Sequence, residues 1–170
     1  MQRRTLLNVG VFTGAAMGLI GVGAAFLYEP GWRAGHLTQA GRSVLAAVAR
    51  AVLDGSLPGD AGLQQEALSA HLSRMDATLN ALPPATQREV NRLLALLATP
   101  PGRSALAGLP TDWALANVEE LHDALQRMRV SRVSLRQQAY HALRDLTHAA
   151  YFADSGTWSL LGYPGPTVIV

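Results

Sequence analysis

The chain contains no cysteine and no lysine among its 170 residues. The absence of cysteine excludes disulfides, iron–sulfur clusters, covalently attached c-type haem and thiol catalysis from this chain. The absence of lysine excludes a Schiff base and an amine nucleophile. The sequence also lacks a glycine-rich phosphate loop and a G-x-S-x-G nucleophile elbow. No catalytic constellation stands out, and we expect a chain that is not an enzyme.

The chain also carries little net charge. The formal net charge is +2, and Arg3 and Arg4 account for all of it. Without these two, the remaining twelve arginines face twelve acidic residues. A nucleic-acid-binding domain should carry a clustered basic surplus, so we do not expect a nucleic-acid partner. The length and the hydrophobic fraction of 49% indicate one domain with a sizeable core.

Residues 1–28 have the layout of an export signal. Two adjacent arginines, Arg3 and Arg4, precede about two dozen residues without a charge. The stretch "RRTLL" resembles the twin-arginine export motif, in which the translocase recognises the arginine pair. Gln2 and Asn8 depart from the residues usual at their positions in that motif. The glycine-rich and only moderately hydrophobic segment that follows suits the same pathway.

Whether this signal is cleaved is left open by the sequence. Gly23 and Ala25 form a passable small-x-small pair, but a clean A-x-A site is missing. Residues 5–28 are long enough to span a bilayer, with the arginine pair held in the cytoplasm. Both alternatives place the rest of the chain in the periplasm, free or anchored to the inner membrane.

Helical spacing of apolar residues, interrupted by proline and glycine, predicts an all-α fold. We expect a small bundle of about five helices within residues 29–153. A signal or anchor helix in 1–28 precedes it, and an extended Pro/Gly aromatic tail in 154–170 follows. The expected helices cover residues 38–54, 60–82, 84–98, 112–128 and 131–153, with at most a short helix in the connector 99–113. Asp60 is the expected N-cap of the second helix, and Pro83-Pro84 ends the second helix and starts the third.

The last two expected helices differ in the sign of their charge. Their inward positions would be Leu115, Val118, Leu121, Leu125 and Met128 in the first, and Leu135, Ala139, Leu143, Leu146 and Ala150 in the second. The first carries Asp112, Glu119, Glu120 and Asp123, and the second carries Arg132, Arg136 and Arg144. We interpret them as antiparallel neighbours that exchange surface ion pairs, and a docking patch is the alternative.

The histidines suggest a metal site that the helix faces argue against. Glu119-x-x-His122 and Asp145-x-x-His148 resemble the two halves of a di-iron carboxylate site, and Glu66 and Glu89 could complete it. The ligands of such a site project into the bundle. Asp145 and His148 instead share a side opposite the apolar stripe of their helix, while His122 borders the core. We therefore expect no metal in this chain.

The end of the chain changes character. The tail "YFADSGTWSLLGYPGP" places aromatic residues among glycines and prolines, and Asp154 with Ser155 can cap a short helix that Gly162 stops. Two interpretations remain open: the tail closes the core, or its aromatic side chains bind a partner protein. The candidate partner-binding residues are Tyr151, Phe152, Trp158, Gly162, Tyr163, Pro164 and Gly165.

The stretches "ALRDLTHAAYFAD" and "TWSLLGYPGP" resemble the C-terminus of the gluconate 2-dehydrogenase subunit 3 family. This family includes the small (gamma) subunits of membrane-bound FAD-dependent sugar dehydrogenases. The upstream stretches "VLAAVARAVLDGSLPGD" and "LPPATQREVNRLLALLATPPGRSALAG" are similar to it as well. The resemblance covers most of the body, its tail is the sharpest motif, and the twin-arginine leader agrees with it.

The resemblance implies a non-catalytic subunit without a cofactor of its own. Such a subunit binds a large GMC-type flavoprotein that holds FAD, assists its maturation and carries it through the twin-arginine translocase. A multihaem cytochrome c usually completes the complex. The alternative function is a membrane-anchored periplasmic scaffold or chaperone without a dehydrogenase partner.

Overall fold

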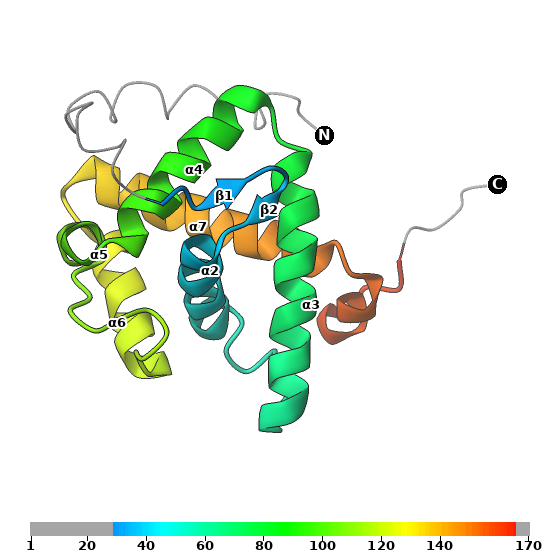
Figure 1. Cartoon of the computed structure of the whole chain (residues 1–170). Helices are drawn as coiled ribbons and strands as arrows, with labels where there is room; N and C mark the ends of the chain where they lie inside the picture. Colours follow the sequence, from blue (N-terminus) through cyan, green and yellow to red (C-terminus); the bar gives the residue numbers. More distant parts are fainter. Residues whose placement is uncertain (1–28, 166–170) are drawn as a thin grey trace.

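The computed structural model describes residues 29–165, which form a mostly helical domain (Figure 1). Two short strands, β1 (Trp32–Arg33) and β2 (His36–Leu37), come first. The helices are α2 (Gln39–Val52), α3 (Ala61–Asn80), α4 (Pro84–Ala98), α5 (Pro100–Ala107), α6 (Val118–Arg129) and α7 (Ser134–Phe152), followed by the 3-10 helix η2 (Ser155–Leu161). The predicted all-α class is confirmed. The expected signal or anchor helix lies outside the described residues.

Within residues 29–165, no helix combines the length and the apolar character needed to cross a membrane.

Local signals place the starts of the first three helices where the sequence predicts them. The Thr38 hydroxyl accepts a hydrogen bond from the Gly41 amide at the start of α2. The Asp60 carboxylate accepts hydrogen bonds from the Gly62 and Leu63 amides and caps α3. Pro84 occupies the first position of α4, where the missing N–H costs nothing.

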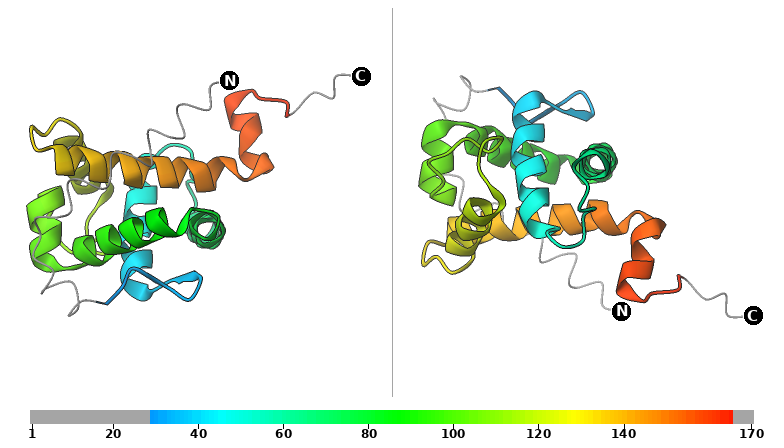
Figure 2. Two further views of the ribbon diagram at one scale, coloured as in Figure 1. Left: turned by 90° about the horizontal axis from the view of Figure 1, so that it is seen from above. Right: turned by 90° about the horizontal axis from the view of Figure 1, so that it is seen from below.

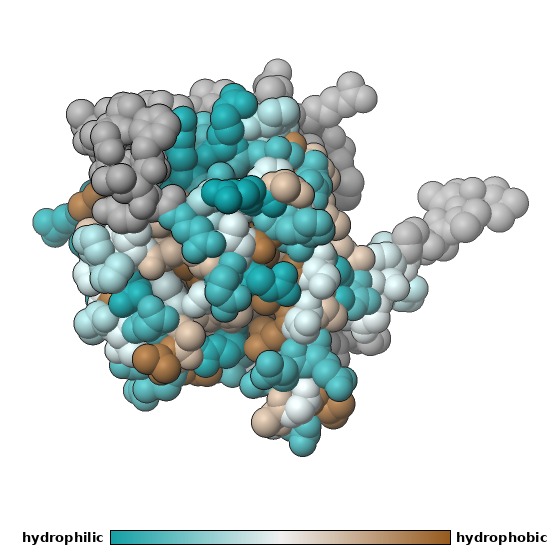
Figure 3. Space-filling model, in the orientation of Figure 1, coloured by the Kyte–Doolittle hydropathy of each residue, from teal (hydrophilic) through white to brown (hydrophobic). Residues whose placement is uncertain are grey.

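Helix α2 lies at the centre of the bundle and contacts α3, α4, α6 and α7. Figure 2 shows it crossing between α4 on one side and α7 on the other. Its Val44, Leu45 and Val48 are fully buried, as expected for the helix that every layer of the core covers. Polar side chains cover most of the face shown in Figure 3, with apolar side chains scattered among them.

A short hairpin with strands of two residues each covers one side of the bundle, and the sequence does not predict it. β1 and β2 pair antiparallel. The Trp32 amide donates to the side-chain oxygen (Oδ1) of Asn91 in α4 at 2.8 Å, and the Leu37 amide donates to the Asp76 carboxylate of α3 at 2.7 Å. The hairpin therefore ties the start of the described chain to two helices that follow it.

Helix α6 begins six residues later than predicted. Asn117 and Glu120 form a reciprocal capping box, so the helix starts at Val118. The preceding residues form a loop in which Trp113 is buried and Leu115 is 79% exposed. The expected inward position of Leu115 is wrong because the helical phase does not extend back to it.

The expected ion pairs between the last two helices are also wrong. Helices α6 and α7 do pack together, but in residues 29–165 no salt bridge joins them. The charges pair elsewhere: Asp112 with Arg103, Asp123 with Arg127 and Arg144 with Asp145. Helices α6 and α7 thus contact each other through apolar side chains, and these charged side chains form ion pairs with residues close to them in the sequence.

Candidate functional site

The last turn of α7 sends two neighbouring aromatic side chains in different directions. Tyr151 is buried against Ala49 and Leu53 of the α2 end, and its hydroxyl donates to the Ser56 carbonyl oxygen at 3.3 Å. Phe152 is 37% exposed. Tyr151 therefore closes a small part of the core, as one interpretation of the tail predicts, while Phe152 stays available on the surface.

Asp154 turns the chain from α7 into η2. One carboxylate oxygen accepts the Gly156 amide at 2.9 Å, and the other lies 3.1 Å from the Arg74 guanidinium of α3. The Thr157 hydroxyl is within hydrogen-bond distance of the Asp154 and Tyr151 carbonyl oxygens, at 2.8 and 3.2 Å. These contacts fix the start of η2 across the end of α7.

Trp158 and Tyr163 form an aromatic pair beyond this turn. Their ring centroids are 5.5 Å apart, and the Tyr163 amide donates to the Trp158 carbonyl oxygen. The Trp158 indole N–H donates to the Phe152 carbonyl oxygen at 2.8 Å. Gly162 has a φ of +66°, which lets the chain reverse and return Tyr163 to Trp158.

The structure brings the candidate aromatic residues together at one end of α7, where η2 projects from the bundle (Figures 1 and 2). Trp158 and Gly165 are half-buried, whereas Gly162, Tyr163 and Pro164 are exposed. The signal residues Arg3 and Arg4 lie outside the described residues. The tail thus divides into a core-closing tyrosine and an aromatic group of Phe152, Trp158 and Tyr163, in which Phe152 and Tyr163 are exposed and Trp158 is half-buried.

A hollow of about 270 Å³ lies beneath η2, and the sequence does not predict it. Its wall comes from the α2–α3 loop, from α3 and from the α7–η2 turn, and includes His71, Arg74 and Tyr151. His71 is 1% exposed, and neither ring nitrogen has a hydrogen-bond partner among residues 29–165. Burial, followed by the nearby Arg74 charge, lowers its pKa to about 4. At neutral pH the imidazole is therefore uncharged.

A second hollow, of about 260 Å³, lies between α6 and α7 and brings together two histidines of the metal hypothesis. The residues that line it include His122, Leu125, Arg144 and His148. His122 also lies 3.3 Å from Asp54 and is more exposed than its expected place beside the core. His148 is half-buried here, although we expected its side of α7 to face water, and burial lowers its pKa. Among residues 29–165, no three histidine, aspartate or glutamate side chains are arranged to hold a metal ion.

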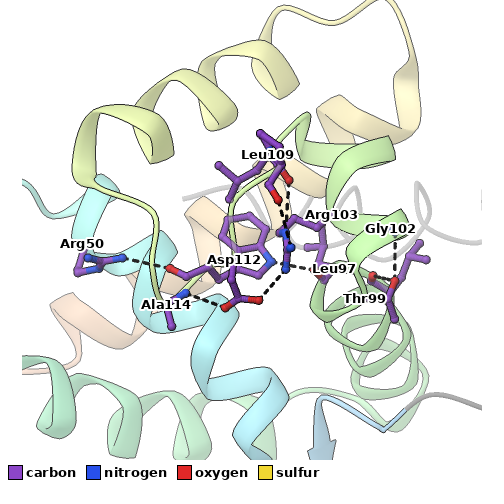
Figure 4. Close-up of polar contacts among 11 residues, drawn as sticks. Arg50, Leu97, Thr99, Gly102, Arg103, Leu109, Asp112 and Ala114 are labelled. Carbon is purple, nitrogen blue, oxygen red and sulfur yellow. Dashed lines mark hydrogen bonds and ion pairs between the residues drawn. The ribbon is translucent and has the colours of Figure 1, made fainter.

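Asp112, which precedes Trp113 in the connector between α5 and α6, pairs with a buried arginine (Figure 4). The Arg103 guanidinium donates to Asp112 at 2.8 Å and to the carbonyl oxygens of Leu109 and Pro110. The Trp113 indole N–H donates to the Leu97 carbonyl oxygen at 2.7 Å. Arg50 donates to two further carbonyl oxygens, those of Trp113 and Ala116. These bonds satisfy the polar backbone of the α5–α6 connector, which packs against the core.

No protein-family model, curated protein or solved structure matches the chain.

Proposed function

We propose that this chain is the non-catalytic small subunit of a periplasmic dehydrogenase complex. It binds a large FAD-containing subunit of the GMC type, assists its maturation and carries it through the twin-arginine translocase. The FAD belongs to the partner, and a multihaem cytochrome c is a further candidate member of the complex. The observation that carries this proposal is the resemblance of the leader "RRTLL" and the tail "TWSLLGYPGP" to those of such subunits.

The arrangement of the tail supports this proposal. The rings of Trp158 and Tyr163 contact each other, and the Trp158 indole N–H donates a hydrogen bond to the Phe152 carbonyl oxygen. Tyr and Trp are among the residue types that contribute most to protein–protein affinity, particularly when the chain already holds them in place, and Tyr163 is exposed while Trp158 is half-buried. The contacts at Asp154 and Thr157 hold them in this way.

The test is recovery of the full-length chain, tagged after Val170, from the membranes of its own cells. We expect a large subunit with a flavin absorption band to co-purify, with or without haem. Expression of that large subunit alone should leave inactive protein in the cytoplasm. Full periplasmic activity in the absence of this chain would overturn the proposal.

Variants of the tail locate the contact. Replacement of Trp158 and Tyr163 by alanine should reduce recovery of the flavoprotein at least tenfold, since each aromatic anchor is worth about 1–2 kcal/mol or more. Leu115→Ala is the matched control because Leu115 is an exposed apolar residue on a distant loop. Circular dichroism should show unchanged helicity for all variants. Recovery of the chain without any flavoprotein would favour the membrane-anchored scaffold or chaperone.

A further inference from the structure

The turn between α6 and α7, residues 129–133, exposes two apolar side chains on the surface. Val130 is 61% exposed and Val133 is 53% exposed. A single exposed apolar residue is ordinary in a soluble domain, but two exposed β-branched residues on one tight turn form a small apolar patch. Ser131 and Arg132 separate them.

In the sequence, arginines flank this apolar patch on both sides and no acidic residue lies near it. Between Asp123 and Asp145 the chain holds five arginines and no aspartate or glutamate. Three of these arginines are engaged away from the turn: Arg127 near Asp123, Arg136 on the Ala105 carbonyl oxygen and Arg144 on Asp145. At the turn itself, among the described residues, Arg129 donates only to the neutral Gln126. The Arg132 side chain has no ion pair or hydrogen bond within residues 29–165. In this part of the chain, therefore, no acidic group pairs with Arg129 or Arg132.

Apolar side chains at a tip, flanked by arginines, match the chemistry of an anionic lipid surface. Phosphate headgroups attract the guanidinium groups, and the valines enter the boundary between headgroups and acyl chains. A protein partner would be expected to meet aromatic anchors, and residues 129–133 contain none. The charge and the residue types of the turn therefore favour lipid over protein.

The position of the turn agrees with such a contact. The turn and η2 lie at opposite ends of α7 in both views of Figure 2. At 1.5 Å per residue, the 19 residues of α7 separate the two ends by about 28 Å. A bilayer at the turn would leave the aromatic group of Phe152, Trp158 and Tyr163 free for another protein.

The geometry points to a peripheral membrane contact at the α6–α7 turn, in which Val130 and Val133 insert into an anionic lipid surface while Arg129 and Arg132 bind its phosphate groups. This contact does not depend on the proposed function, because it requires only the chain and the lipid. It orients the body on the membrane whether or not the N-terminal segment stays attached.

The absence of cysteine makes a direct test possible, since one introduced cysteine is the only site for a fluorescent label. The full-length Val130→Cys variant carries an environment-sensitive fluorophore and is mixed with phosphatidylcholine vesicles, with or without about one third phosphatidylglycerol. The matched control is Leu115→Cys, an exposed apolar position near Asp112 and Glu119. The N-terminal segment is the same in all variants, so differences between labels report the turn.

We expect a blue shift and quenching by lipid-attached quenchers at position 130, with anionic vesicles only, and no change at position 115. Arg129→Gln with Arg132→Gln should raise the vesicle concentration for half-maximal shift more than about tenfold, whereas Arg88→Gln with Arg92→Gln should not. A high salt concentration should weaken the shift. Equal signals at positions 130 and 115, no signal at 130, or no effect of removing Arg129 and Arg132 would each overturn the inference.

Discussion

The Arg103 guanidinium lies 2.8 Å from the Asp112 carboxylate and bridges helix α5 to the connector that leads into α6. Arg103 is only 6% exposed, while the Asp112 side chain is about half exposed. The same guanidinium donates to the Leu109 and Pro110 carbonyl oxygens. One buried cation thus organises a segment without regular secondary structure.

Arg103→Met should destabilise the domain by about 1–3 kcal/mol, because the buried Leu109 carbonyl oxygen loses its donor and the connector loses its contacts to a buried side chain. Urea unfolding followed by circular dichroism measures this change. Arg88→Met, at an exposed position of α4, is the control and should change stability by less than about 0.5 kcal/mol. A loss below about 1 kcal/mol for Arg103→Met would show that water replaces the guanidinium at little cost.

The elements that the sequence predicts well are those whose signals are local. Thr38 and Asp60 cap the helices that they precede, and Pro84 occupies the first position of α4. The start of α6 is missed because apolar spacing seemed to continue through Leu115, whereas the capping box of Asn117 and Glu120 decides the boundary. The hairpin is missed because two-residue strands are too short to show alternation.

The candidate site shows the same division between local and tertiary information. The sequence identifies the aromatic residues of the tail, but it cannot tell Tyr151 from Phe152, because their different burial depends on packing against α2. The position of His71 carries a usable signal. It lies three residues after Leu68 and four before Met75, on the inward face of α3. A list of apolar residues alone omits it.

The buried His71 should make the domain less stable at acidic pH. Its pKa falls from 6.5 to about 4 on folding, so the unfolded chain takes up the proton first as the pH drops. The free energy of unfolding should therefore decrease between about pH 6.5 and pH 4, by up to about 3 kcal/mol from this group, and this loss should level off below pH 4.

His71→Leu isolates this contribution, since other groups titrate equally in both proteins. The variant should match or exceed the wild-type stability at pH 7, because it removes an unpaired buried imidazole, and should gain further below pH 6.5. His141→Leu, at an exposed position of α7, is the control for the substitution itself and should change the stability at pH 7 by less than about 0.5 kcal/mol. Parallel profiles for wild type and His71→Leu would contradict the assignment.

Gly41→Ala should destabilise the domain by about 1–3 kcal/mol. A methyl group at this position of α2 would overlap the carbonyl oxygen of Gly31, where the chain crosses the helix before the hairpin. Gly59→Ala is the control because its added methyl group meets no atom within 4 Å. Thermal unfolding of the two variants compares them directly. Equal stabilities would mean that the segment around Gly31 shifts without cost.

The ion pair between Arg74 and Asp154 should control how often η2 detaches from the bundle. Both side chains are partly exposed, so breaking the pair should change global stability by less than about 1 kcal/mol. Local opening can respond more clearly, since the ion pair joins the turn to α3, whereas the Gly156 amide, the Thr157 hydroxyl and the Trp158 indole donate to residues 151–154. Arg74→Gln keeps the hydrogen bond between Asp154 and the Gly156 amide while removing the charge.

Brief chymotrypsin digestion measures this opening, because Phe152 and Trp158 are cleavage sites at the end of α7 and in η2. Arg74→Gln should raise the initial cleavage rate there about threefold to tenfold, in proportion to the population of the open form. Arg42→Gln, which removes the distant 3.9 Å contact to Asp76, should leave this rate unchanged. An equal increase in both variants would indicate general loosening of the domain, and no increase in Arg74→Gln would mean that Thr157 and Tyr151 hold the turn without the ion pair.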